Sequence, residues 1–277
     1  RVFSSFDPTI ILGLAFEDRT TMPWDFWVGE IALYRGGVET PAQPASGSCS
    51  GNWGGYEQGS ITKYWFTQGT VDFGDINCSF GITNIGTESG GDAVDQVATG
   101  NGSYFGAMNT ADYNTAAACG ACVEVNADNG KSVVLTIVDQ CPIDSNPLCV
   151  EGHIDLSVDA YDALGLPVGY YGKGAQGSLS WQYTPCPTSG GVEFRLKEPN
   201  NSFWNMIIVE NHTYPIAKLE VETDRGWLQA SREAFNFWLP PGGNIGNGNI
   251  RVTDINGNQV EGSVSASGGT APQLACE

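Results

Sequence analysis

Residues 152–157 read Gly-His-Ile-Asp-Leu-Ser, and this stretch decides how the rest of the chain is interpreted. Its carboxylate, Asp155, stands just ahead of a predicted helix, where a proton donor can be placed. Far upstream, residues 62–66 read Thr-Lys-Tyr-Trp-Phe, an aromatic stretch that contains no acid. Hydrolysis of a glycosidic bond requires a second carboxylate. A lone proton donor therefore suggests a site that grips saccharide without cutting it.

The composition favours a β-rich protein of two modest domains. The chain has 277 residues, among them 37 Gly and 14 Pro, which is typical of many short strands joined by turns. A chain of this length can bury sizeable cores. Every apolar run is shorter than the roughly 18 residues that cross a bilayer, so no membrane association is expected.

The charge argues against several kinds of partner. The sequence has 31 acidic and 12 basic residues, a formal net charge of −19. Such a field repels phosphate backbones, anionic lipids and pectin-like polymers, so we expect no nucleic acid partner. It does not repel a neutral polysaccharide, although acidity also serves simply to keep a secreted protein soluble.

Eight cysteines indicate disulfides and an oxidising compartment, and we expect a secreted, extracellular protein. Cys119-Gly-Ala-Cys122 also has the spacing of zinc and redox sites, but no second pair repeats it and the chain has only two histidines. We therefore expect no metal and no cofactor. The predicted pairs are Cys122–Cys186 and Cys141–Cys149, then Cys78–Cys119, and finally the two cysteines left over, Cys49–Cys276.

The sequence divides into four segments that differ in composition and residue pattern. Residues 1–35 contain two apolar stretches that predict strands, too few to fold alone. With Pro23-Trp24-Asp25-Phe26-Trp27 they resemble the last strands of a jelly-roll carbohydrate-binding module, and we expect either the remnant of a larger domain or a segment that packs on the rest of the chain. Residues 36–50 are predicted to be a linker. The two full domains are predicted over residues 51–187 and 188–277.

The two full domains carry different patterns. In the first, a strand over residues 132–139 follows a turn at Asp128-Asn129-Gly130. Ser157 and Gly165 predict the start and the end of a helix over residues 158–164. Short strands with one or two helices indicate a small barrel. In the second, residues 191–265 alternate apolar and polar side chains, which predicts a β-sandwich.

Motifs from both domains resemble the expansins and their barwin-like relatives. Cys119-Gly-Ala-Cys122, Val138-Asp139-Gln140-Cys141-Pro142 and His153-Ile-Asp155-Leu-Ser157 resemble motifs of the double-psi barrel of that family. Phe203-Trp204 and residues 209–215 resemble the cellulose-binding second domain of microbial expansins. The resemblance covers about residues 51–265. It implies a six-stranded double-psi β-barrel followed by an immunoglobulin-like β-sandwich, and a non-hydrolytic loosening of plant cell walls.

The resemblance also implies polar residues in the groove of the barrel. These are Thr62, Asp139 and Asp155, none of them expected to be catalytic. Each has a plainer alternative, as a strand residue, a hydrogen-bond acceptor and a helix cap respectively, and His153 is expected to be structural. Microbial expansins often have a tyrosine two residues after the first acid, where this chain has Cys141, as in the plant and fungal branch. The missing sugar contact is then expected from Tyr64, Trp65, Tyr104 or Tyr113.

Aromatic residues of the second domain are expected to bind polysaccharide. Phe203, Trp204 and Phe235 match the three aromatics on the expansin binding face. Flat rings stack on the C–H faces of glucose and bury apolar area at little entropic cost. Lys197 is expected to donate to sugar hydroxyls beside them. The alternative is core packing, which we expect at least in part for Trp227, Phe237 and Trp238.

Three other functions fit this barrel. An inverting endoglucanase resembling glycoside hydrolase family 45 needs an acid and a base about 6.5–9.5 Å apart. Asp155 matches the acid, but Phe66 stands at the expected position of the base, and Asp72 or Asp75 would replace it only through a folded-back loop. A lytic transglycosylase needs a single acid. A barwin-type lectin would not need a second aromatic domain. We therefore predict a non-enzymatic monomer that binds cellulose, with xylan and other neutral glucans as further partners.

Overall fold

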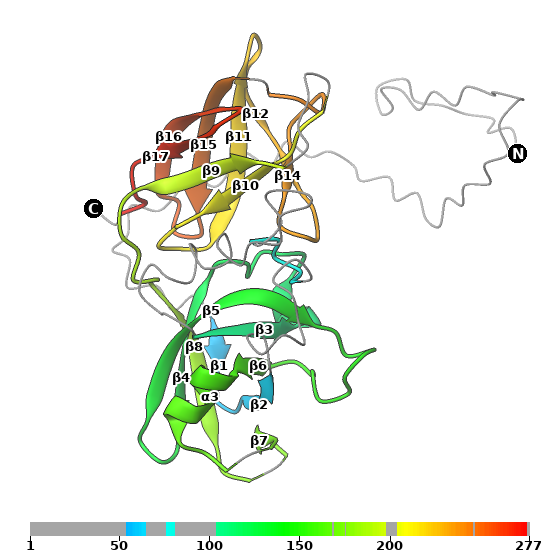
Figure 1. Ribbon diagram of the computed structural model, residues 1–277, viewed down its shortest axis with the longest axis vertical. Helices are drawn as coiled ribbons and strands as arrows, with labels where there is room; N and C mark the ends of the chain where they lie inside the picture. The colour runs from blue at the N-terminus through cyan, green and yellow to red at the C-terminus, as the bar shows by residue number, and fades with distance from the viewer. Residues whose placement is uncertain are drawn as a thin grey trace, which may run out of the picture. The chain divides into compact units, whose positions relative to one another are not determined.

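A computed structural model of the chain describes residues 54–64, 76–80, 104–167, 169–174, 176–197, 204–245 and 247–275. Within these ranges two β-sheets follow one another along the sequence, and Figure 1 shows the first in blue to green and the second in yellow to red. The predicted N-terminal strands and linker, residues 1–50, lie outside the described residues. The predicted domain boundaries stay predictions.

Eight strands form the first sheet: β1 Gly55–Tyr56, β2 Ser60–Tyr64, β3 Phe105–Asn109, β4 Cys122–Ala127, β5 Ser132–Cys141, β6 His153–Ser157, β7 Tyr171–Gly172 and β8 Leu179–Thr184. Their order is β1-β8-β4-β5-β3-β6-β2-β7. Strand β2 is parallel to β6, and β3 is parallel to β5 but antiparallel to β6. Since β1 and β7 have only 2 residues each, six longer strands carry the sheet. The predicted double-psi β-barrel is confirmed.

Two short helices in the first domain begin at capped residues. They are α2, Thr110–Tyr113, and α3, Val158–Leu164. The Ser157 side chain accepts a hydrogen bond from the first turn of α3, and Gly165 ends the helix in the left-handed conformation, with φ of 63°. Both ends of α3 therefore lie where the sequence predicted. Among the described residues, no helix has the length and apolar character needed to cross a membrane.

Buried side chains of the barrel form a core that continues into the second domain. Alternating residues of β4 and β5, such as Val123 and Leu135, are fully buried. The same core includes Met206, Ile208 and Phe237, which come from the second sheet or its loops. The barrel and the following sheet are therefore joined by apolar packing.

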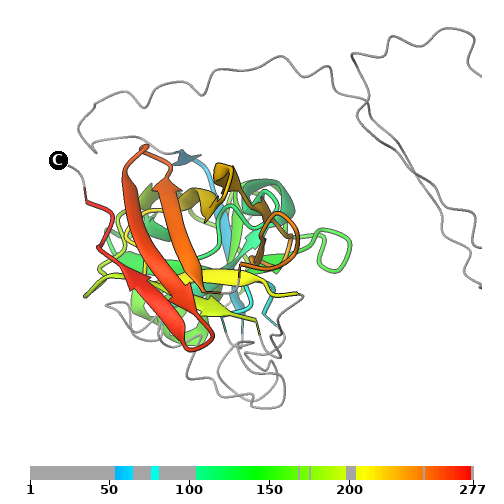
Figure 2. The ribbon, with the colours of Figure 1, turned by 90° about the horizontal axis from the view of Figure 1, so that it is seen from above.

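The second sheet consists of nine strands: β9 Val192–Leu196, β10 Ile207–Glu210, β11 Ile216–Thr223, β12 Gly226–Gln229, β13 Ser231–Arg232, β14 Trp238–Leu239, β15 Gly248–Asp254, β16 Gln259–Ser265 and β17 Gly268–Ala271. Their order is β12-β11-β15-β16-β17-β9-β10-β14-β13. Figure 2 shows β15 to β17 side by side in orange to red, in agreement with their antiparallel pairing. The predicted β-sandwich is confirmed.

Two of the three aromatics assigned to the core are indeed buried there. Phe237 is fully buried and Trp238 is 3% exposed. Trp227 is only partly buried, and its ring lies 4.5 Å from the Arg251 guanidinium carbon. A cation stacked on a ring of this kind covers the ring without placing it in the core.

Among the residues that the structure describes, three disulfides tie the barrel together. They join Cys78 to Cys119, Cys122 to Cys186 and Cys141 to Cys149, which are three of the expected pairs. Cys49 and Cys276 lie outside the described residues, so their pairing stays a prediction.

Candidate functional site

Asp155 is held by side chains from two parallel strands. Strands β2 and β6 pair Ser60 with His153 and Thr62 with Asp155, so all four side chains lie on one face of the sheet. The Thr62 hydroxyl donates to Oδ1 of Asp155. Nε2 of His153 lies 3.0 Å from the same oxygen, and its Nδ1 lies 2.9 Å from Oγ of Ser60.

His153 positions the carboxylate from inside the barrel. Its side chain is fully buried and Asp155 is only 4% exposed. The Tyr170 ring stacks on the imidazole, with ring centroids 5.7 Å apart. The sequence analysis expected a structural role for His153, with which its burial agrees, but it did not identify the contact with Asp155. Its signal was the spacing, because residues two apart on a strand point to the same face.

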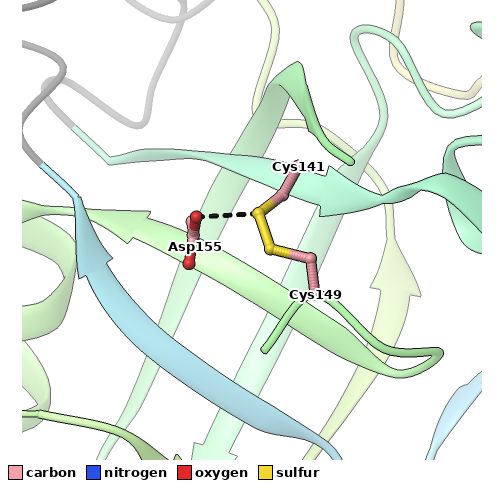
Figure 3. Close-up of side chains that lie close together, drawn as sticks. All are labelled: Cys141, Cys149 and Asp155. Atoms are coloured by element: carbon pink, nitrogen blue, oxygen red, sulfur yellow. Dashed lines mark hydrogen bonds between the residues drawn. A yellow bond between two sulfur atoms is a disulfide. The ribbon is translucent and has the colours of Figure 1, made fainter. Parts of the chain in front are cut away.

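The other oxygen of Asp155 lies against a disulfide. Oδ2 is 3.0 Å from Sγ of Cys141, as the dashed line in Figure 3 shows. Because Cys141 is bonded to Cys149, its sulfur has no proton to donate, and the contact is one of carboxylate oxygen with sulfur. The three residues offer ligand atoms within 4.8 Å of one another, but oxidised sulfurs are not the thiolates that bind metals.

Asp139 lies on the same face of the sheet as Asp155, with one strand between them. Ala107 of β3 pairs with Asp139 of β5 on one side and with Asp155 of β6 on the other. Two strand spacings, about 9–10 Å, therefore separate the backbones of the two acids. Both side chains project from the same face, because directly paired residues do so.

The surroundings of Asp139 raise its pKa. Its Oδ1 accepts hydrogen bonds from the backbone N–H groups of Asn77 at 2.7 Å and Gln140 at 2.8 Å, which favour the charged form. Burial outweighs them and, with the nearby charge of Asp155, raises the pKa of Asp139 to about 6. Within the described residues, Oδ2 accepts no hydrogen bond. The side chain as a whole is partly exposed.

One of the candidate tyrosines flanks this pair of acids. Tyr64 is partly exposed, and burial followed by the charges of Asp139 and Asp155 raises the pKa of its hydroxyl. The suggestion that Tyr113 contacts sugar is wrong. Tyr113 is 2% exposed, and its hydroxyl donates to the carbonyl of Ala234 at 2.9 Å. The side chain is therefore buried where the two domains meet. Tyr104 packs against the barrel core, and Trp65, Phe66, Asp72 and Asp75 lie outside the described residues.

The loop that carries Phe235 is fixed to the barrel beside Asp139. Residues 234–236 of this loop meet residues 77–79 of the barrel through three hydrogen bonds. The loop is therefore held by both backbone and side-chain groups of a segment that also binds the acid. The bonds run from Asn77 Nδ2 to the Ala234 carbonyl (3.3 Å), from Ser79 Oγ to the Phe235 carbonyl (2.7 Å) and from Asn236 Nδ2 to the Cys78 carbonyl (3.1 Å).

The remaining predicted binding residues of the second domain are partly described. Trp204 is 39% exposed, as a stacking residue should be. Lys197 places its Nζ 5.5 Å from the centre of the Phe237 ring, at the surface of the same domain. Phe203 lies outside the described residues. The roles of Phe203, Trp204, Phe235 and Lys197 stay predictions.

Comparison with known proteins supports the assignment of the barrel. A family model described as lytic transglycolase, a double-psi β-barrel domain, matches residues 88–183. Expansin-YoaJ of Bacillus subtilis is 30% identical over 162 residues, which cover 57% of this chain and 65% of that protein. Expansin-like protein 5 of Dictyostelium discoideum is 27% identical over 162 residues, covering 57% of this chain and 66% of that protein. The matched region thus spans less than two thirds of these relatives.

Solved structures extend the likeness to both domains. The apo expansin of Clavibacter michiganensis is 25% identical, with a TM-score of 0.60, and the match covers 79% of this chain and 98% of that one. A mutant of the same protein in complex with cellohexaose has the same fold, at 23% identity and a TM-score of 0.59. The fold defines a two-domain protein in which a double-psi β-barrel precedes a β-sandwich. In both domains the chain is similar to expansins.

Proposed function

We propose that this chain is a secreted, non-hydrolytic protein that binds cellulose or related neutral glucans and loosens contacts between wall polysaccharides. Its relatives are expansins, and the mutant Clavibacter expansin was solved with cellohexaose, a fragment of cellulose. A net charge of −19 does not repel a neutral glucan. The three disulfides suit an oxidising, extracellular setting.

One observation carries the proposal: Asn77 joins Asp139 of the barrel to the loop of the second domain that carries Phe235. Its backbone N–H binds Oδ1 of Asp139, and its side-chain amide binds the carbonyl of Ala234. Phe235 follows Ala234 directly in the sequence. Phe235 is partly buried and packs against the barrel core, and a glucan chain lying along Asp139 would meet the second domain at this loop.

The barrel groove offers a ligand one accessible acid and one enclosed acid. Oδ2 of Asp139 accepts no hydrogen bond from the described residues, and above pH 6 the group is ionised and can accept from a sugar hydroxyl. Both oxygens of Asp155 are already in contact, one with Thr62 and His153 and the other with a disulfide sulfur. The contacts of these two acids suit the binding of a sugar better than the transfer of a proton to it.

Hydrolysis is the second candidate, because Asp139 stands where a base could act. The backbones of Asp139 and Asp155 lie about 9–10 Å apart, and inverting glycosidases hold their carboxyl groups about 6.5–9.5 Å apart. A lytic transglycosylase would need Asp155 alone, and the family model that matches the barrel is described by that activity.

A combined wall-extension and product assay decides among these functions. The unmodified protein should extend isolated walls and release no steady stream of reducing ends from amorphous cellulose or mixed-linkage glucan. Asp155→Asn should abolish extension and leave cellulose retention intact. Asp162→Asn, at an exposed residue paired with Lys63, is the control and should behave as the unmodified protein does. Steady release that Asp155→Asn or Asp139→Asn removes would establish hydrolysis, and products with anhydro ends would establish a transglycosylase.

A further inference from the structure

The loop between β5 and β6 carries three of the five most exposed large hydrophobic side chains of the described residues. The five are Ile143 (49%), Leu148 (41%), Ile255 (41%), Val150 (39%) and Trp204 (39%). The first, second and fourth of them lie within residues 142–150. Single exposed apolar residues are ordinary on a protein surface, but a group of them in one short segment indicates a binding surface. The proposed function assigns no role to this loop.

The 142–150 loop is fixed by bonds at its base and within it. The Cys141–Cys149 disulfide closes it. The carbonyl of Pro142 accepts hydrogen bonds from the backbone N–H groups of Ser145 at 3.1 Å and Asn146 at 3.0 Å. Figure 1 shows the loop in green, projecting from the barrel between the ends of β5 and β6. The exposure of its apolar side chains therefore belongs to the folded structure.

The base of this loop is part of the groove that holds the two acids. Strand β5 carries Asp139 and ends at Cys141, whose sulfur lies 3.0 Å from Oδ2 of Asp155. Strand β6 begins at His153, whose backbone N–H donates to the carbonyl of Val150 at 3.0 Å. Asp139 lies two residues, about 7 Å, from the end of β5. An oligosaccharide of several sugar units that runs along β5 past Asp139 therefore reaches the 142–150 loop.

The charge and the size of the loop restrict what it can bind. Residues 141–152 include two acids, Asp144 and Glu151, and no basic residue. An anionic lipid surface would repel such a segment. A specific protein partner requires about 800 Å² of surface on each side, and three half-exposed aliphatic side chains supply a small part of that area.

A glucan chain has the chemistry that this loop can cover. Each glucose ring presents C–H groups on its faces and hydroxyl groups at its edge. Aliphatic side chains bury apolar area against such a face, and an exposed carboxylate such as Asp144 can accept from a hydroxyl at the edge. Both kinds of group are therefore present in one fixed loop beside the groove.

We propose that Ile143 and Leu148 of the 142–150 loop bind the C–H face of a glucan chain where that chain leaves the barrel groove. The inference rests on the proposed function, since the polymer is the one held in the groove. It adds an apolar contact to a groove whose other candidate contacts, Thr62, Asp139 and Asp155, are polar. The barrel then holds a glucan ring by its face as well as by its hydroxyl groups.

Cellohexaose tests this contact in the full chain. In methyl NMR spectra, the signals of Ile143 and Leu148 should shift saturably as cellohexaose is added, while binding is followed independently in the signals of the sugar. The matched control is Ile255 of the second domain, which is 41% exposed and whose signal should not move. Single replacements of these residues assign their signals. Cellohexaose that binds without moving the signals of Ile143 and Leu148 would overturn the proposal.

Substitutions in the loop separate its failure from failure of the proposed function. Ile143→Ser and Leu148→Ser in one chain should weaken cellohexaose binding roughly fivefold, because apolar area is lost, and Ile255→Ser should leave it unchanged. If the unmodified protein binds neither cellohexaose nor cellulose, the proposed function fails and this inference fails with it. If it binds both, and the double variant behaves as Ile255→Ser does, the loop contact alone is refuted. Sedimentation with neutral lipid vesicles that the double variant loses would assign the loop to a lipid surface and would also overturn the proposal.

Discussion

Replacing Asp139 with asparagine tests whether the barrel groove keeps its accessible acid at a cost in stability. In the folded protein the pKa of Asp139 is raised from 3.8 to about 6, mainly by burial. Between these two values the folded state binds more protons than the unfolded state does. The free energy of unfolding contributed by this group therefore falls as pH rises through that window, and the loss is complete above the folded pKa.

The size of the effect follows from the shift. The difference of 6 − 3.8 is 2.2 pKa units, which at about 1.36 kcal/mol per unit gives about 3 kcal/mol. Asparagine keeps an Oδ1 that can accept from the backbone N–H groups of Asn77 and Gln140, and it removes the charge. Because the side chain is partly exposed, the new amide can donate to water. Asp139→Asn should thus be more stable than the unmodified protein by about 3 kcal/mol at about pH 7.5, and equal to it near pH 3.5.

Urea unfolding across this pH range measures the difference directly, since subtracting the two proteins cancels the other titrating groups. Asp128→Asn is a control of opposite sign. The hydroxyl of Tyr171 and the backbone N–H of Ser178 lower the pKa of Asp128. The stability that Asp128 contributes is present at pH values above the pKa of the unfolded state and is lost as the pH falls. Relative to the unmodified protein, Asp128→Asn should therefore become less stable as the pH rises. A difference for Asp139→Asn that is constant, or that grows toward low pH, would refute the reasoning.

Three further predictions concern the second domain, the helix and the charge. Trp204→Ala should weaken retention on cellulose by about 1–3 kcal/mol in depletion isotherms, and Trp227→Ala should not; equal losses would remove Trp204 from the binding face. Ser157→Ala removes the cap of α3 and should lower the free energy of unfolding in urea by about 1 kcal/mol; no change would mean that the cap contributes nothing. Cellulose binding should change less than about twofold between low and high salt, and steep weakening would contradict binding to a neutral polymer.

The parts of the structure that depend on neighbouring residues could be predicted from the sequence. Ser157 and Gly165 mark the two ends of α3, because capping is decided within one turn of the helix. Alternation along Val192, Phe194 and Leu196 predicts a strand with one buried face, and all three side chains are buried. The motifs around Asp139 and Asp155 indicated the barrel through a resemblance, which local pattern alone would not have supplied.

The parts that depend on strand order could not be predicted. Asp139 and Asp155 become neighbours because β3, from an earlier part of the chain, lies between β5 and β6 and brings Ala107 between the acids. Nothing in the spacing of two acids along a sequence reveals a strand inserted between them. The burial of Tyr113 against the Ala234 carbonyl is likewise a contact between domains, and the sequence gives it no signal.

The same geometry gives the two acids different surroundings. An acid that protonates a glycosidic oxygen must present an oxygen to it, yet both oxygens of Asp155 are engaged and its side chain is 4% exposed. Part of that enclosure comes from the Cys141–Cys149 disulfide, which lies where the sequence had pointed to an absent tyrosine. Oδ2 of Asp139 accepts no hydrogen bond from the residues that the structure describes, but a base needs an acid partner able to act at the same moment. These surroundings agree with the proposed role of holding a glucan rather than cleaving it. Asp155→Asn should therefore abolish wall extension and leave the binding of cellulose intact.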